Sequence, residues 1–197
     1  MPTDSNSILC VAAAFTNKDY YKYNEFDPIL VANDYVTRGK FKRGYDCPIS
    51  KTGCFAFICG KPYFNKNCDT KLIKAACEEN ESYFQQNLAI FKGIKEPKLA
   101  FSNGGTVQSY RFLCELTDKT LAIVEIYGLN YTNAIDYLLQ SKDQTNTNIN
   151  HALYLDMGDW SDGWYRDSKF IYDINSNQKL DSIKRNNHQT NWIVVSK

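Results

Sequence analysis

The sequence predicts an α+β fold, with a mixed, mainly antiparallel sheet and two main helices in a single domain over residues 1–197. Three observations lead to this prediction. Most apolar residues fall in short runs bounded by glycine, asparagine or charged residues, as strands do. Two segments place their apolar residues at helical spacing instead. The connections are mostly of hairpin length, and 197 residues suffice for one hydrophobic core.

The first third of the chain indicates strands and turns. Apolar runs cover Ser7–Phe15 and Pro28–Val36, and a basic turn or hairpin with two glycines follows over Thr37–Tyr45. Thr52–Gly60 is a short apolar run between glycines, and the GKP that overlaps its end indicates a turn. These segments are expected to supply the first strands of the sheet.

A first helix is predicted to begin at a cap formed by Asp69 or Thr70 and to end at Asn80. Its apolar stripe consists of Leu72, Ile73, Ala76 and Cys77. Tyr83–Phe91 is predicted to be one strand, and Lys95–Gln108 to be a loop with SNGGT at its centre. That glycine-rich loop is either flexible or able to hold an anion through backbone N–H groups.

The middle of the chain indicates a hairpin followed by a helix. Two apolar runs, Tyr110–Leu116 and Thr120–Tyr127, are joined by a short polar turn. The second helix is expected over Thr132–Ser141, with Thr132 as its cap. Its apolar stripe consists of Ala134, Ile135, Leu138 and Leu139.

The C-terminal part contains fewer apolar runs. His151–Leu155 is expected to be a short buried strand, and Trp192–Val195 a final strand. Residues 157–190 are polar, aromatic and irregular, with one short strand predicted at Phe170–Tyr172.

Composition and charge exclude several classes of partner. Apolar residues make up 43% of the chain and charged residues 23%, with a net charge of +1 and no basic stripe along the sequence. We therefore expect no nucleic-acid partner and no membrane span. The start, MPTDSNSILCVAAAF, lacks the basic region of a signal peptide.

Cysteine and histidine usage argues against a zinc site. The seven cysteines form no CxxC pair, and the two histidines, His151 and His188, are far apart in sequence. No cofactor is expected, although a divalent metal stays open. Disulfides also stay open among Cys47, Cys54, Cys59 and Cys68.

An ordered set of short motifs carries a family resemblance. The segments VAAAFT, GCFAFICGKPYF, FQQNLAIFKG, YRFLCELTDKTLAIVEIYG, HALYLDMGDWS and NWIVV follow one another from about Ile8 to Val195. In this order they resemble the phosphodiester glycosidase family, whose signature Ala-x-x-Leu-Asp-Gly-Gly is similar to ALYLDMG here. Met157 replaces the first signature glycine, and the opening turn lacks the family's Asn-Gly-Gly.

The resemblance implies a set of site residues. It makes Asp156 and Arg111 the catalytic candidates, and it places the family's glutamine at Gln85 or Gln86, which would face opposite sides of a strand. A guanidinium binds phosphate through paired hydrogen bonds, which suits Arg111. The further substrate-binding candidates are Thr16, Gly158, Trp160 and Arg166.

Each candidate also has a structural alternative. Asp156 ends an apolar run before Gly158, so its carboxylate either acts as a general acid or base or bonds the backbone of a turn. Arg111 either holds phosphate or forms a surface pair with Glu125 or Asp118. Thr16 either donates a hydroxyl or simply ends a strand, and His151 is expected to be structural.

The aromatic segment after the signature is also ambiguous. Its large side chains either line a sugar platform or fold inward as a cluster; they are Trp160, Trp164, Tyr165 and Arg166. Asp159 and Asp162 flank them and are candidates for the second carboxylate that glycosidases ordinarily use.

The resemblance implies a hydrolase that cleaves the glycosidic bond of a sugar-1-phosphodiester, so that the expected partner is a carbohydrate or a sugar phosphodiester. The family is often exported, which extends to this chain as an expectation. Two other functions stay open: a catalytically silent glycan-binding module of the same fold, and a protein-interaction domain with an exposed apolar patch.

Overall fold

The structure is a computed structural model of the whole chain. It describes residues 7–12, 33–44, 52–66, 68, 70–96, 108–140, 148–155, 163–167, 170–173, 178–180 and 192–196. The chain divides into two compact units, which we call the central unit (Ala32–Leu155) and the terminal unit (Met1–Val31 with Asp156–Lys197). The prediction of one domain over residues 1–197 stays a prediction.

The central unit contains two helices and most of the strands. The helices are α1 (Thr70–Glu78) and α2 (Tyr131–Gln140). The strands are β2 (Tyr35–Thr37), β3 (Lys40–Lys42), β4 (Gly53–Ile58), β5 (Lys61–Asn65), β6 (Ser82–Gln86), β7 (Leu88–Phe91), β8 (Ile94–Lys95), β9 (Gln108–Leu116), β10 (Leu121–Leu129) and β11 (Ile149–Tyr154).

The terminal unit is made of strands from both ends of the chain. They are β1 (Ser7–Ala12), β12 (Gly163–Asp167), β13 (Phe170–Asp173), β14 (Lys179–Leu180) and β15 (Trp192–Ser196). They form one antiparallel sheet in the order β14-β13-β12-β1-β15. Strands β12 and β14 lie in the segment 157–190, where the sequence predicted only the strand that became β13.

Two five-stranded sheets form the body of the central unit. The α1-side sheet has the order β3-β2-β6-β4-β5, and the α2-side sheet has the order β10-β9-β11-β7-β8. All strand pairs in the described part of the chain are antiparallel. The α+β class, the mainly antiparallel pairing and both helices are thus confirmed. The strands form separate sheets rather than the one expected.

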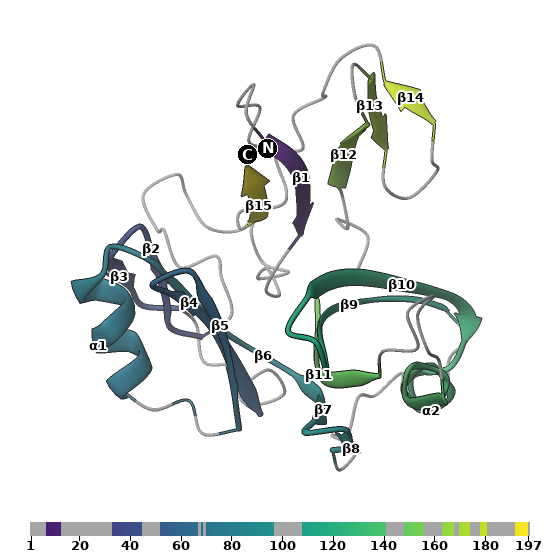
Figure 1. Ribbon diagram of the computed structural model, residues 1–197, viewed down its shortest axis with the longest axis horizontal. Helices are drawn as coiled ribbons and strands as arrows, with labels where there is room; N and C mark the ends of the chain where they lie inside the picture. Colours follow the sequence, from purple (N-terminus) through teal and green to yellow (C-terminus); the bar gives the residue numbers. More distant parts are fainter. Residues whose placement is uncertain are drawn as a thin grey trace, which may run out of the picture. The chain divides into compact units, whose positions relative to one another are not determined.

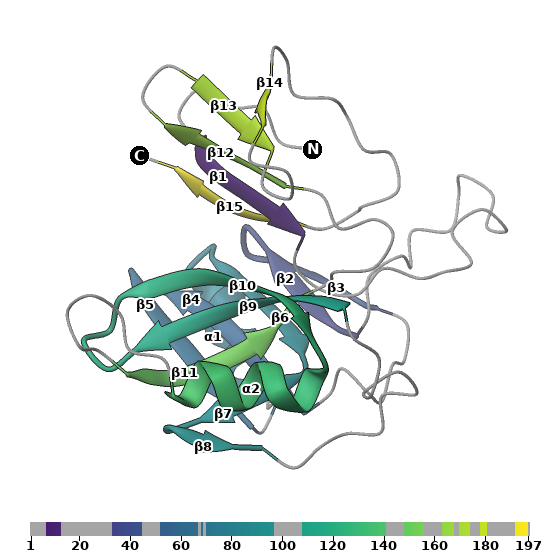
Figure 2. The same cartoon turned by 90° about the vertical axis from the view of Figure 1, so that its right-hand side faces the viewer.

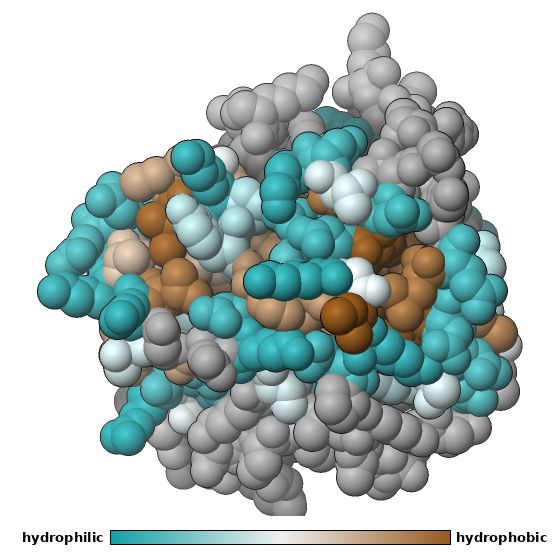
Figure 3. All heavy atoms as spheres, turned by 60° about the horizontal axis from the view of Figure 1, so that its bottom comes forward, coloured by the Kyte–Doolittle hydropathy of each residue, from teal (hydrophilic) through white to brown (hydrophobic). Residues whose placement is uncertain are grey.

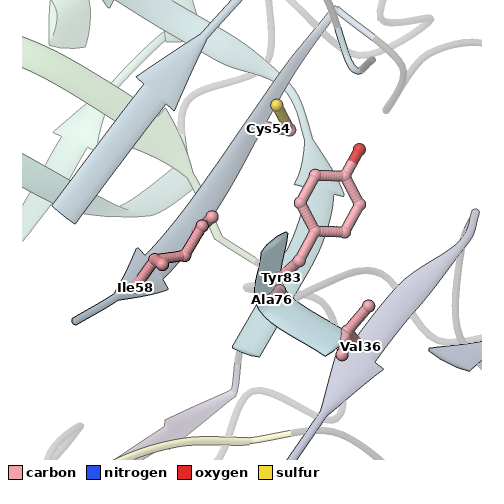
Figure 4. Packing of buried hydrophobic residues seen from close by; sticks show 6 residues of the cluster. Val36, Cys54, Ile58, Ala76 and Tyr83 are labelled. Carbon is pink, nitrogen blue, oxygen red and sulfur yellow. The ribbon is translucent and has the colours of Figure 1, made fainter. Parts of the chain in front are cut away.

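Helix α1 covers one face of its sheet. Side chains from β2, β4, β6 and α1 form a buried cluster on that face, shown in Figure 4: Val36, Cys54, Ala56, Ile58, Ala76 and Tyr83. Asn80 follows the helix with a positive φ of 58°, and the N–H of Glu81 bonds the carbonyl of Ala76 at 2.8 Å. This is the left-handed helix end that asparagine tolerates, so the predicted end at Asn80 is confirmed.

Helix α2 covers the other sheet with an aromatic cluster. Tyr131, its first residue, packs against Tyr110 and Phe112 of β9 and Tyr154 of β11, with ring centroids 5.5 to 6.4 Å apart. The predicted cap at Thr132 is wrong. The side-chain oxygen of Asn130 accepts the N–H of Asn133 at 2.9 Å, because the helix begins one residue earlier and its cap precedes Tyr131.

The uncovered faces of the two sheets meet. Phe64 of β5 stacks on His151 of β11 with ring centroids 5.2 Å apart. Gly53 is required close by, because a Cβ atom there would lie 2.5 Å from the Cβ of Leu88. The layers of the central unit therefore run α1, α1-side sheet, α2-side sheet, α2, as Figures 1 and 2 show from two directions.

A single residue, Asn87, connects the α1-side sheet to the α2-side sheet. The segment Tyr83–Phe91, predicted as one strand, is divided into β6 and β7 with Asn87 between them. Strand β6 pairs with β2 and β4, whereas β7 pairs with β8 and β11. The apolar pattern continues across the junction, which is why it reads as a single strand.

Candidate functional site

An ion pair between a completely buried arginine and a glutamate whose side chain is 12% exposed lies on the facing side of the α2-side sheet. Arg111 of β9 is 0% exposed, and its Nε donates to the carboxylate of Glu125, its direct neighbour on β10. The carboxylate also accepts the hydroxyl of Tyr127. Arg111 shares its sheet face with Glu115 and with His151, which contacts the other sheet. Arg111 therefore pairs with Glu125, one of the two partners considered from the sequence, but its guanidinium lies in the interior rather than at the surface.

Backbone hydrogen bonds bring three candidate segments to one end of the α2-side sheet. The N–H of Leu155 bonds the carbonyl of Arg111, and the N–H of Tyr154 bonds the carbonyl of Asn87, both at 2.8 Å. Gln86 precedes Asn87 in the chain, and Asp156 follows Leu155. The structure thus joins the backbone next to Gln86 and the backbone of Arg111 through the end of β11.

The two candidate glutamines have different surroundings. The amide of Gln85 donates to the hydroxyl of Tyr83 at 3.0 Å, on the sheet face that α1 covers. Gln86 lies opposite Gly53 on the other face, toward the α2-side sheet. It is 0% exposed, and neither polar atom of its amide has a hydrogen-bond partner among the described residues. A buried amide without partners costs free energy, so Gln86 is the member of the pair whose hydrogen-bonding groups are not used by the described residues.

Asn87 is a polar junction that the sequence reasoning missed. Its side-chain oxygen accepts the hydroxyl of Thr52 at 2.8 Å, and its side-chain nitrogen donates to the hydroxyl of Tyr131. Thr52 in turn accepts the N–H of Leu88 at 3.0 Å. The only signal in the sequence was the polar QQN inside an otherwise apolar segment. Asn87 positions the end of β6, and with it Gln86.

Several predicted site residues lie outside the described residues. They are Thr16, Asp156, Gly158 and Trp160, together with the carboxylates Asp159 and Asp162. The SNGGT loop and Cys47 lie outside them as well.

The described residues of the aromatic segment belong to β12. Trp164 is 0% exposed, so its ring is not presented to solvent as a sugar platform. Arg166 lies with its guanidinium 5.7 Å from the centroid of that ring, on the same side of the strand. Within the terminal unit, Arg166 thus contacts the buried tryptophan.

A second polar cluster surrounds His151. Its Nδ1 accepts the backbone N–H of Lys92 at 3.2 Å, and its Nε2 lies 3.6 Å from the carboxylate of Glu115. That carboxylate also accepts from the amide of Asn150 at 2.7 Å and lies 3.4 Å from the Nζ of Lys119. The backbone donor at Nδ1 requires an unprotonated nitrogen there, so the proton of the neutral ring is on Nε2.

We expect the stability of the protein to fall in acid partly through His151. Burial lowers the pKa of His151 below its ordinary value of 6.5; Lys119 and Lys92 add to the effect and Glu115 opposes it. At pH values between the lowered pKa and 6.5, His151 binds a proton more readily in the unfolded chain than in the folded one. Its contribution to the free energy of unfolding is therefore complete above pH 6.5 and decreases as the pH falls. Melting temperatures of wild type and His151→Gln from pH 8 to pH 5 test this, because His188 is common to both. Parallel curves for the two proteins would contradict it.

The described part of the chain offers no obvious metal centre. It holds no group of three or more His, Cys, Asp or Glu side chains placed to bind a metal ion. Of the cysteines considered for disulfides, the described ones, Cys54, Cys59 and Cys68, are not joined in a disulfide in this structure. Among the described helices none combines the length and the apolar character that a bilayer span requires.

Large exposed apolar side chains are scattered over the described part of the chain. They come from five different elements and are Phe41, Tyr63, Ile94, Tyr127 and Tyr137. On the face shown in Figure 3, hydrophobic residues are interrupted by hydrophilic ones. This pattern does not favour a protein-interaction domain that works through one large apolar patch.

In comparisons with known proteins, no protein-family model and no curated protein matches this chain.

Proposed function

We propose that this protein is a hydrolase that cleaves a sugar-1-phosphodiester, as its resemblance to the phosphodiester glycosidases implies. Water would add across the bond between the anomeric carbon and the phosphate oxygen. That bond breaks, the sugar gains a hydroxyl group, and a phosphomonoester leaves. In this proposal the substrate is a carbohydrate, and no cofactor is required.

One observation carries the proposal. At the end of β11, the N–H of Tyr154 bonds the backbone of Asn87, next to Gln86, and the N–H of Leu155 bonds the backbone of Arg111. Gln86 and Arg111 are far apart in the sequence. This link supports a common site for the glutamine and the arginine rather than two unrelated polar residues.

Arg111 would hold the phosphate group. Glu125 accepts from its Nε, and a phosphate would have to compete for the terminal nitrogens, which complete the planar fork that binds phosphate. A buried guanidinium attracts an anion more strongly than an exposed one, because little water screens the interaction. Glu125 keeps the cation in a fixed orientation.

Asp156 would be the general acid or base, and Gln86 would orient the sugar or the phosphate. Asp156 directly follows a buried residue, Leu155, whose N–H is fixed to β9. A carboxylate at the end of such a rigid strand is suited to proton transfer. We assign the amide role to Gln86 rather than Gln85, because Gln85 already donates to Tyr83.

Hydrolysis of a panel of sugar-1-phosphodiesters, including N-acetylglucosamine-1-phosphodiesters, tests the proposal. We expect turnover by the wild type and a loss of about 100-fold or more in Asp156→Asn, since general acid–base groups contribute that much. Arg111→Lys keeps the charge but not the planar fork, and should raise KM for the phosphodiester. Release of sugar and of phosphomonoester is measured separately.

The matched control is Asp136→Asn, which makes the same chemical change on α2 in a carboxylate paired with Lys95. This variant should retain full turnover. No turnover by the wild type on any substrate, with and without divalent metal ions, would overturn the proposal. Equal turnover by Asp156→Asn and the wild type would overturn the assignment of Asp156.

A further inference from the structure

The hairpin of β2 and β3 concentrates positive charge on a nearly neutral chain. Four cations fall within six consecutive residues and all are exposed: Arg38, Lys40, Lys42 and Arg43. The whole chain has a net charge of only +1. None of the four has an ion-pair partner among the described residues. We call residues 38–43 the basic hairpin.

An exposed aromatic ring lies among these charges. Phe41 of β3 is 48% exposed, although it pairs with Val36, a member of the buried cluster under α1. Strand β3 is the edge of its sheet and pairs only with β2. A partner that binds at this edge therefore contacts side chains from both faces of β3, with Lys40 and Lys42 on one face and Phe41 on the other.

The shape of the basic hairpin is fixed by its turn. Arg38 and Gly39 have φ angles of 48° and 71°, the left-handed pair that matches the twist of a two-residue hairpin. The N–H of Gly39 bonds the carbonyl of Glu81 at 2.9 Å, which attaches the turn to the end of α1. A rigid hairpin presents its charges with little loss of entropy on binding.

Among the described residues, no neighbouring carboxylate forms an ion pair with the basic hairpin. Glu79 follows the end of α1 and is exposed. Asp34 accepts the N–H of Gly44 at 3.3 Å. The remaining acid near the turn is Glu81, whose backbone carbonyl makes the contact with Gly39. The four cations of the hairpin are exposed to solvent.

We propose that the basic hairpin docks the protein on an anionic membrane surface. The cations would lie at the level of the lipid phosphate and carboxylate groups, and Phe41 would enter the interfacial region. A polyanion without bases would complement the four charges but would leave the exposed ring without an apolar partner. A bilayer surface provides the negative charge and the apolar phase together. This inference does not depend on the proposed hydrolase activity.

Co-sedimentation with vesicles tests the proposal. The full chain should bind vesicles of phosphatidylcholine with phosphatidylserine, bind pure phosphatidylcholine weakly, and dissociate at high salt. Removing two charges in Lys40→Gln/Lys42→Gln should weaken binding about 30-fold. Phe41→Trp should show a blue shift of its fluorescence on adding the anionic vesicles, relative to the wild type.

The control is Lys61→Gln/Lys71→Gln, which removes the same charge from exposed positions on β5 and α1. Its binding should change much less than that of the hairpin variant. Equal losses in both variants would show a general charge effect and overturn the proposal. Lysines on edge strands also prevent self-association. If Lys40→Gln/Lys42→Gln self-associates while its vesicle binding is unchanged, the lysines protect the edge and the proposal is wrong.

Discussion

Replacing Glu125 with glutamine should lower the free energy of unfolding by about 3–5 kcal/mol. Arg111 is completely buried, and a guanidinium is a cation without an acceptor of its own. The substitution removes the carboxylate that compensates this charge, and the interior supplies little solvent in its place. Urea unfolding of wild type and variant measures the loss.

A double-mutant cycle separates the interaction energy of the Arg111–Glu125 pair from the cost of leaving one partner unpaired. Arg111→Met and Glu125→Leu should each be strongly destabilising, whereas the double variant should recover much of the loss, because it buries no unpaired charge. The half-exposed pair of Lys95 and Asp136 is the control, with an expected coupling below about 1 kcal/mol. A coupling for the buried pair as small as that of the control would contradict the prediction.

Replacing Asn87 with alanine should cost about 2–4 kcal/mol. The change removes two side-chain hydrogen bonds and leaves the hydroxyls of Thr52 and Tyr131 without this partner. It also loosens the junction at which the chain passes from one sheet to the other. Urea unfolding again gives the magnitude.

Two further variants give the Asn87 prediction its reference points. Tyr131→Phe removes only the hydroxyl that accepts a hydrogen bond from the side-chain nitrogen of Asn87. The loss in free energy of unfolding should therefore be a fraction of that of Asn87→Ala. Asn133→Ala, on the exposed side of α2, should be neutral or slightly stabilising because alanine favours helix. Equal effects of Asn87→Ala and Asn133→Ala would show that Asn87 is not a structural junction.

Features with a local cause could be predicted from the sequence. Both helices follow from apolar residues three and four positions apart, and the end of α1 follows from the conformational tolerance of Asn80. The hairpin of β9 and β10 follows from two apolar runs around a short polar turn. By contrast, β14 is two residues long, too short to give an alternating pattern.

Features with distant causes could not be predicted. The break at Asn87 depends on partners 35 and 44 positions away, Thr52 and Tyr131. The surroundings of Gln85 and Gln86 depend on pairing with β4, since a shift of one residue would exchange their faces. The pairing of Arg111 with Glu125 was one of two alternatives, but its burial depends on how two sheets pack together.

The single-residue passage between β6 and β7 has a consequence for how the central unit opens. Asn87 is bonded through its backbone to β11 and through its side chain to Thr52 before β4 and to Tyr131 at the start of α2. Neither sheet can separate without breaking these bonds. The amide protons of β6, β7 and β11 should therefore exchange with solvent in one cooperative event, and the two sheets behave as a single unit of local unfolding.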